Sequence, residues 1–364
     1  MSFLKSFFQK KEQPITSYAD FWNWFQQHEK KFHKVLRKGG DVQGVFFDKL
    51  AAKLGELKDG FWYTAGMFTD EVAELVITPD GVIENIVFVE ELVAAAPKMN
   101  HWKFTALKQP SDIKNIRIGM GAHSFSSENL SFYPIDHKDY PDEIDIVVVH
   151  HDYNDKDKNL IINGTYLFLD NYLGELNSVT TIDNLKVISK AEATAELIPI
   201  LKLKDFLIWR EKEFIEKYKG IRHNTEEDNF ISLEATLPND FPLFAIINSD
   251  LLAWDRKASH PWIAIFKILY DGKDNYGMPN EKEYELLATI EEEILQELKD
   301  AEGYLNIGRQ TADSEREIYF ACVDFRLPSK VLHKIKEKYK DDFGIQFNIF
   351  KDKYWQSFNR FDTN

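Results

Sequence analysis

The chain has 364 residues, more than one hydrophobic core usually organises, so we expect two domains or one domain with an internal duplication. Hydrophobic residues make up 44% and aromatic residues 14%, which excludes an extensively disordered chain. Sixty acidic against 45 basic residues leave a formal charge of −15, and without a local basic patch this charge excludes nucleic acid as an expected partner.

The cysteine count and the N-terminus bear on the compartment. A single cysteine, Cys322, excludes an internal disulfide and a cysteine-based metal cluster, and it fits a reducing compartment. No apolar run approaches the ~20 residues that a membrane span needs. The opening MSFLKSFFQKKEQP lacks the features of a secretory signal. We interpret it as an arm packed on its own domain or on a partner chain; the alternative is a short amphipathic surface anchor.

The first elements predicted are three helices and three strands. Periodicity predicts helices over Tyr18–Arg37, Val45–Leu57 and Ile83–Ala96, and strands over Phe61–Phe68, Val72–Thr78 and Trp102–Leu107. A second unit of similar order begins near Ile116. It has strands around Arg117–Met120, Leu130–Ile135, Ile144–Val149 and Leu185–Ile188, and a helix over Ile162–Leu176. Whether residues 1–220 form one region or two similar units stays open.

A helix over Leu201–Tyr218 ends the N-terminal part, because Gly220 suits a left-handed helix cap. The polar, aperiodic segment 221–229 is the predicted linker. The domains expected are therefore an N-terminal α+β region, 1–220, and a C-terminal domain, 230–364.

The C-terminal pattern predicts a ferredoxin-like βαββαβ plait. Asn280 and Glu283 form a capping box for the first helix, and its apolar stripe is Leu287, Ile290, Ile294 and Leu298. The strands expected are Trp262–Tyr270, Tyr304–Gln310, Glu317–Val323 and Gly344–Phe350, with a second helix over Ser329–Tyr339. Two extra strands, Phe230–Thr236 and Leu243–Asn248, precede them.

Alternation in the last strand predicts one covered sheet face and one open face. Gln346, Asn348 and Asn306 lie on the open face, with Lys267 as a further candidate, because neighbouring strand residues point to opposite sides. That face is open to a ligand, a partner chain or the extra strands. The predicted interaction face comprises Arg309, Gln346, Asn348, Tyr354 and Trp355.

From about Pro242 to Phe361 the chain resembles domain-of-unknown-function family 695. The motifs that carry the resemblance, in order, are FPLFAIINSDLLAW, HPWIAIFKILYDG, GMPNEKEYELLATIEEEI, YLNIGRQTADSEREIYFACVD and KDKYWQSF. The resemblance implies an uncharacterised bacterial protein, and it supplies no catalytic residues.

The segment EIDIVVVHHDYNDKDKN, residues 143–159, suggests a metal site at His150, His151 and Asp152. Adjacent strand residues point to opposite faces, so both histidines cannot bind one ion unless the chain turns at once. The four apolar residues Ile146 to Val149 leave no polar face, which predicts a central strand covered on both sides. We therefore interpret the histidines as the point where this strand reaches water, and we predict no metal.

Other motifs favour structural roles. Gly119 and Gly121 lack the third glycine of a dinucleotide fingerprint and indicate a kink or turn. Cys322 lies within a strand and is expected to be buried. Ser249, Asp250, Asp255 and His260 have the residue types of a hydrolase triad but lie in a connector without a nucleophile elbow.

These patterns favour a cytoplasmic protein without catalytic activity or cofactor, which acts through protein binding or as a homo-oligomer, and the resemblance implies that it is bacterial. The alternative is an enzyme with a site between the two regions, using His123, His150 or His260 with carboxylates.

Overall fold

The computed structural model describes residues 14–362, and its contacts divide the chain into two compact units, Met1–Lys108 and Gln109–Asn364. The predicted N-terminal arm lies outside the described residues. The division falls inside the region expected as 1–220, and the segment 221–229 lies within the second unit. That linker stays a prediction. Both units mix helices and strands, which confirms an α+β fold.

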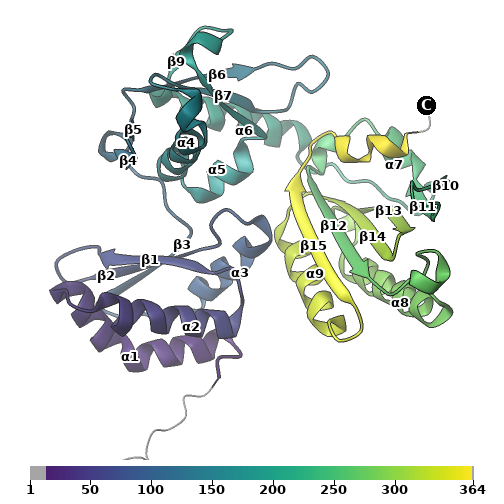
Figure 1. The fold of residues 1–364 in the computed structure, drawn as a ribbon, viewed down its shortest axis with the longest axis horizontal. Helices are drawn as coiled ribbons and strands as arrows, with labels where there is room; N and C mark the ends of the chain where they lie inside the picture. The colour runs from purple at the N-terminus through teal and green to yellow at the C-terminus, as the bar shows by residue number, and fades with distance from the viewer. Residues whose placement is uncertain (1–13, 363–364) are drawn as a thin grey trace, which may run out of the picture. The chain divides into compact units, whose positions relative to one another are not determined.

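The first unit is a three-stranded sheet with helices. Its elements are α1 (Tyr18–Lys38), a π-helical turn (Gln43–Phe47), α2 (Asp48–Leu57), β1 (Trp62–Met67), β2 (Ala73–Thr78), α3 (Ile83–Ala94) and β3 (Trp102–Ala106). Strand β2 pairs antiparallel with β1 and parallel with β3. Figure 1 shows α1 and α2 along one side of this sheet. Phe25 of α1 packs edge-on against Trp102 and Phe104 of β3, so aromatic rings form this core.

The second unit begins with a four-stranded sheet, in the order β8-β7-β6-β9. Its strands are β6 (Leu130–Ile135), β7 (Asp145–His150), β8 (Asn184–Ser189) and β9 (Ile198–Pro199), and its helices are α4 (Lys158–Leu173), α5 (Glu175–Thr181) and α6 (Leu203–Tyr218). A separate hairpin joins β4 (Ile118–Met120) to β5 (His123–Phe125).

Strand β7 is central in this sheet, as its apolar run predicts. All six of its residues are buried. Ile146 and Val148 belong to one hydrophobic cluster, while Val147 and Val149 belong to another. The two clusters lie on opposite sides of β7, because alternate strand residues point to opposite faces. The prediction of a strand covered on both sides is confirmed.

The second unit ends with a six-stranded antiparallel sheet, in the order β10-β11-β13-β14-β12-β15. Its elements are β10 (Phe230–Thr236), β11 (Pro242–Asn248), α7 (Ser249–Ala253), β12 (Trp262–Leu269), α8 (Glu281–Glu297), β13 (Tyr304–Ala312), β14 (Glu315–Cys322), α9 (Arg326–Tyr339) and β15 (Gly344–Lys351). The extra strands β10 and β11 lengthen the sheet beyond β13 and do not cover its face. The predicted capping box of Asn280 and Glu283 begins α8.

The two faces of the six-stranded sheet have different covers. Helices α8 and α9 lie on one face, which we call the helix face (Figure 1). On the other face, Phe358 and Phe361 of the C-terminal 3₁₀ turn, Gln356–Phe361, pack against Tyr319 of β14. Phe244 of β11 is on the helix face and is 43% exposed, so the helices leave this end of the sheet uncovered. Among residues 14–362, no helix is long and apolar enough to cross a membrane.

Candidate functional site

The predicted interaction residues do not share one sheet face. Gln346 and Asn348 are exposed, and Gln346 lies opposite Lys267, which in turn lies opposite Glu317. Glu317 is paired with Gln310, so the neighbouring Arg309 points to the helix face. Register therefore separates Arg309 from Gln346 and Asn348.

The prediction that Asn306 lies on the open face was wrong. Asn306 is paired with Phe320, and Phe320 belongs to the row of Ala264 and Ile349 on the helix face. A register shift between Asn306 and Gly308 changes the alternation of β13 at this point. Simple counting along the strand misses such a bulge.

The two aromatic members of the predicted interaction face lie after β15. Trp355 is 1% exposed, and its indole N–H donates to the backbone oxygen of His260, so it is a core residue. The Tyr354 hydroxyl lies 2.8 Å from the Asp142 carboxylate, to which it donates. Neither side chain extends the exposed surface around Gln346 and Asn348.

The structure separates the histidine pair. His150 is fully buried; its Nδ1 accepts the Asp152 backbone N–H, and its Nε2 donates to the backbone oxygen of Ser124. Burial lowers the pKa of His150, so the neutral ring fits this pattern. His151 is exposed and meets Ser131. Both His150 nitrogens are thus hydrogen-bonded to backbone groups. Of the two histidines, only His151 is exposed to solvent at the end of the strand.

The structure also places the other motifs that the sequence singled out. Gly121 occupies the turn of the β4–β5 hairpin with φ 61°. Cys322 is fully buried, and burial raises the pKa of its thiol. The Ser249 hydroxyl donates to the backbone oxygen of Asn229, whereas His260 meets the adjacent Ser259.

A pocket of about 320 Å³ lies at the uncovered end of the helix face. We call it the arginine pocket, and its lining residues are Phe244, Ile246, Met278, Pro279, Tyr284, Arg309, Thr311 and Arg316. They come from β11, β13, β14, α8 and the loop before α8. Strand register explains the gathering, because Phe244, Thr311 and Arg316 form one row across the sheet and Ile246 and Arg309 form the next.

Arg316 is the unusual member of this pocket. It is only 3% exposed, and its Nε donates to the Thr311 hydroxyl at 3.0 Å. Its guanidinium lies 5.3 Å from the ring centre of Tyr284. Within residues 14–362, no carboxylate forms an ion pair with it. Burial lowers the pKa of Arg316, but an arginine stays charged at neutral pH.

The positive charges of the pocket exceed the negative charge beside it. Arg309 pairs with the buried carboxylate of Glu291 at 2.7 Å, and the negative charge of that carboxylate also acts on Arg316. Two guanidinium groups therefore share one carboxylate. A buried charge without a close partner is unfavourable, so the site favours an added anion. Sequence reasoning selected Arg309 but missed Arg316, whose burial depends on strand pairing.

A second polar cluster lies between β7, β8 and the segment after β15. The Asp142 carboxylate accepts from Lys217, Tyr218 and Tyr354. Burial alone would raise the pKa of Asp142, but these three hydrogen bonds lower it. Lys353, which is almost fully buried, pairs with Asp183 at 2.6 Å.

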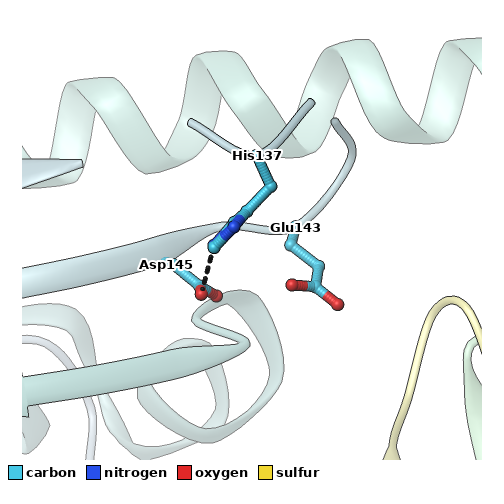
Figure 2. A group of neighbouring side chains, drawn as sticks. All are labelled: His137, Glu143 and Asp145. Atoms are coloured by element: carbon cyan, nitrogen blue, oxygen red, sulfur yellow. Dashed lines mark hydrogen bonds and ion pairs between the residues drawn. The ribbon is translucent and has the colours of Figure 1, made fainter. Parts of the chain in front are cut away.

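His137, Glu143 and Asp145 form the edge of this cluster, and one potential ligand atom from each lies within 4.8 Å of the others. Figure 2 shows the His137 ring directed at Asp145, with the Glu143 carboxylate beside them. The Nε2 of His137 lies 2.8 Å from the Asp145 carboxylate. Burial raises the pKa of Glu143, and the negative charge of Asp145 raises it further.

The enzyme alternative requires at least two of His123, His150 and His260 to converge with a carboxylate in a cleft. A pocket of about 360 Å³ in the second unit is lined by Glu211, Asp324, Lys351 and Lys353 among others. Of the histidines that the structure describes, none lines it. His123 does lie near His150, with ring centres 6.0 Å apart, and it pairs with Asp157. That group includes the fully buried His150, whose two nitrogens are already hydrogen-bonded.

Comparison with known proteins adds one finding. No curated protein and no solved structure matches this chain. Residues 235–361 match the model of a family of unknown function, DUF695. This match confirms the predicted resemblance for the C-terminal third of the chain, and the family description names no activity.

Proposed function

We propose that this is a cytoplasmic bacterial protein that acts by binding another polypeptide and carries out no catalysis. In this proposal the C-terminal domain binds the partner. Its fold is a ferredoxin-like plait. The order β12, α8, β13, β14, α9, β15 and the spatial order β13-β14-β12-β15 support that assignment. The single, buried cysteine fits a reducing compartment.

The observation that carries the proposal is the buried guanidinium of Arg316 without a carboxylate partner in the arginine pocket. An anion from a partner would complete this charge and accept the hydrogen bonds that the guanidinium can still donate. Hydrogen bonds to a buried charged group such as this guanidinium are stronger than those on the open surface. We therefore assign a carboxylate as the group recognised.

The apolar side chains of the arginine pocket favour a particular kind of residue next to the bound carboxylate. Phe244 and Tyr284 are 43% and 53% exposed, and Met278 and Pro279 lie beside them. Such exposed apolar side chains next to a concave site are typical of binding surfaces. The occupant that fits is a polypeptide segment with an acidic residue next to an aromatic or large aliphatic one.

Selection of random peptides displayed on phage tests this function with the purified full chain as bait. The expected result is enrichment of peptides with an acid beside an apolar residue, and loss of their binding to the Arg316→Met variant. Arg360→Met is the matched control, because Arg360 is exposed and hydrogen-bonds the Tyr319 hydroxyl on the other sheet face. Enrichment of peptides without acids, or equal binding to Arg316→Met, would overturn the proposal.

A further inference from the structure

We propose that His137, Glu143 and Asp145 bind a divalent first-row transition metal ion. This site is independent of the arginine pocket, and its residues lie on other elements. One imidazole and two carboxylates are a ligand set that suits zinc, manganese or iron in the divalent state. The three potential ligand atoms already lie within 4.8 Å of one another.

The hairpin between β6 and β7 builds the site. The two strands pair antiparallel, with Ile135 opposite Asp145. Continuation of that register by two residues brings His137 opposite Glu143. Residues 143 and 145 are two positions apart, a spacing that places side chains on the same side of extended backbone. All three ligands therefore come from β7 and the loop that joins it to β6 in the β6–β7 hairpin.

Distant residues hold the two carboxylates in place. Asn184, the neighbour of Asp145 on β8, donates its side-chain N–H to one Asp145 oxygen at 2.8 Å. Gln356 donates in the same way to one oxygen of Glu143 at 2.8 Å. Such outer hydrogen bonds orient the ligands of metal sites. They leave the second oxygen of each carboxylate directed to His137 or free for an ion.

A metal ion would replace the hydrogen bond between His137 and Asp145. The His137 Nε2 and the Asp145 oxygen are 2.8 Å apart, which is a hydrogen bond when Nε2 carries a proton. Binding of the ion to Nε2 requires loss of that proton, and the ring then donates a lone pair.

Isothermal titration calorimetry of the chelator-treated full chain with Zn²⁺ tests the site. We expect one Zn²⁺ per chain, and at least tenfold weaker binding for Glu143→Gln and for His137→Ala. Co²⁺ added to the same protein should give the visible absorption of a bound ion, and both variants should lose it. Circular dichroism melting of each variant shows whether it is folded, and Glu143→Gln keeps the size of the side chain.

The matched controls come from the other end of β7. His151→Ala and Asp152→Asn change a histidine and a carboxylate that the sequence itself suggested as ligands, and they should leave Zn²⁺ affinity unchanged. Wild-type protein that binds no Zn²⁺ would overturn the proposal. Binding that survives in folded Glu143→Gln and His137→Ala, or that is lost only in the control variants, would do the same.

Discussion

Lys353 and Asp183 form an almost completely buried ion pair with an Nζ–Oδ distance of 2.6 Å. The side chains are 1% and 9% exposed, and the residues are 170 positions apart in the chain. Lys353 also donates to the backbone oxygen of Asp142. This pair therefore connects the loop before β8 to the segment that follows β15.

Replacement of Lys353 by methionine is expected to lower the free energy of unfolding by about 2–4 kcal/mol, because it leaves Asp183 with less compensation. The loss of stability is smaller than for a carboxylate left without any partner, since Lys351 still lies 3.0 Å from Asp183. Urea unfolding measures the change. Lys334→Met removes an exposed pair with Glu297 and should cost less than about 1 kcal/mol. Equal effects of the two substitutions would contradict this account.

His260 should make the protein less stable in acid. Burial, with the nearby charges of Arg222 and His223, lowers its pKa from 6.5 to about 3. Between these values the unfolded chain binds a proton that the folded chain does not. Above pH 6.5 His260 is neutral in both states, so its titration does not change the free energy of unfolding. As the pH drops from 6.5 towards 3, proton binding by the unfolded chain lowers that free energy by up to about 1.4 kcal/mol per pH unit.

A comparison of slopes isolates this histidine from the carboxylates that titrate in the same range. Unfolding free energy measured by urea titration at several values between about pH 6 and pH 4 should depend less steeply on pH in His260→Phe than in the wild type. The exposed His151, changed to phenylalanine, is the control and should keep the wild-type slope. A wild-type slope in His260→Phe would show that the buried ring has no such role.

Arg316→Met is expected to leave the free energy of unfolding unchanged or to raise it by up to about 2 kcal/mol. Methionine removes a buried charge that has no ion-pair partner in the described chain, and an apolar side chain suits the surrounding lining. Urea unfolding checks the sign. Lys353→Met is the informative comparison, because that buried cation has a carboxylate partner. A loss of several kcal/mol in Arg316→Met would indicate a structural role for the arginine.

Gly308→Ala should destabilise the second unit by at least about 2 kcal/mol. Gly308 has φ 134°, a region that other residues rarely adopt, and an added Cβ would overlap the backbone oxygen of Ile246. Thermal unfolding followed by circular dichroism measures the effect. In Gly119→Ala, a strand glycine with open space around it, we expect a change below about 1 kcal/mol. Similar losses in both variants would exclude the steric explanation.

The sequence by itself determined the local elements and much of the burial. Strand β10 and strand β6 have the predicted bounds, and helix α1 extends only one residue beyond its prediction. The apolar run of β7 and the buried Cys322 were also predictable, because burial of a strand on both sides removes its polar face. These features depend on neighbours in the chain.

Only the tertiary structure decided which polar side chains meet. The bulge before Gly308 changes the face of β13, and the pairing of β13 with β14 brings Arg316 beside Arg309. Likewise, the β6–β7 register gathers His137 with Asp145, and β8 adds Asn184. Strand register is set by the summed packing and hydrogen bonding of whole sheets, so no short sequence window contains it.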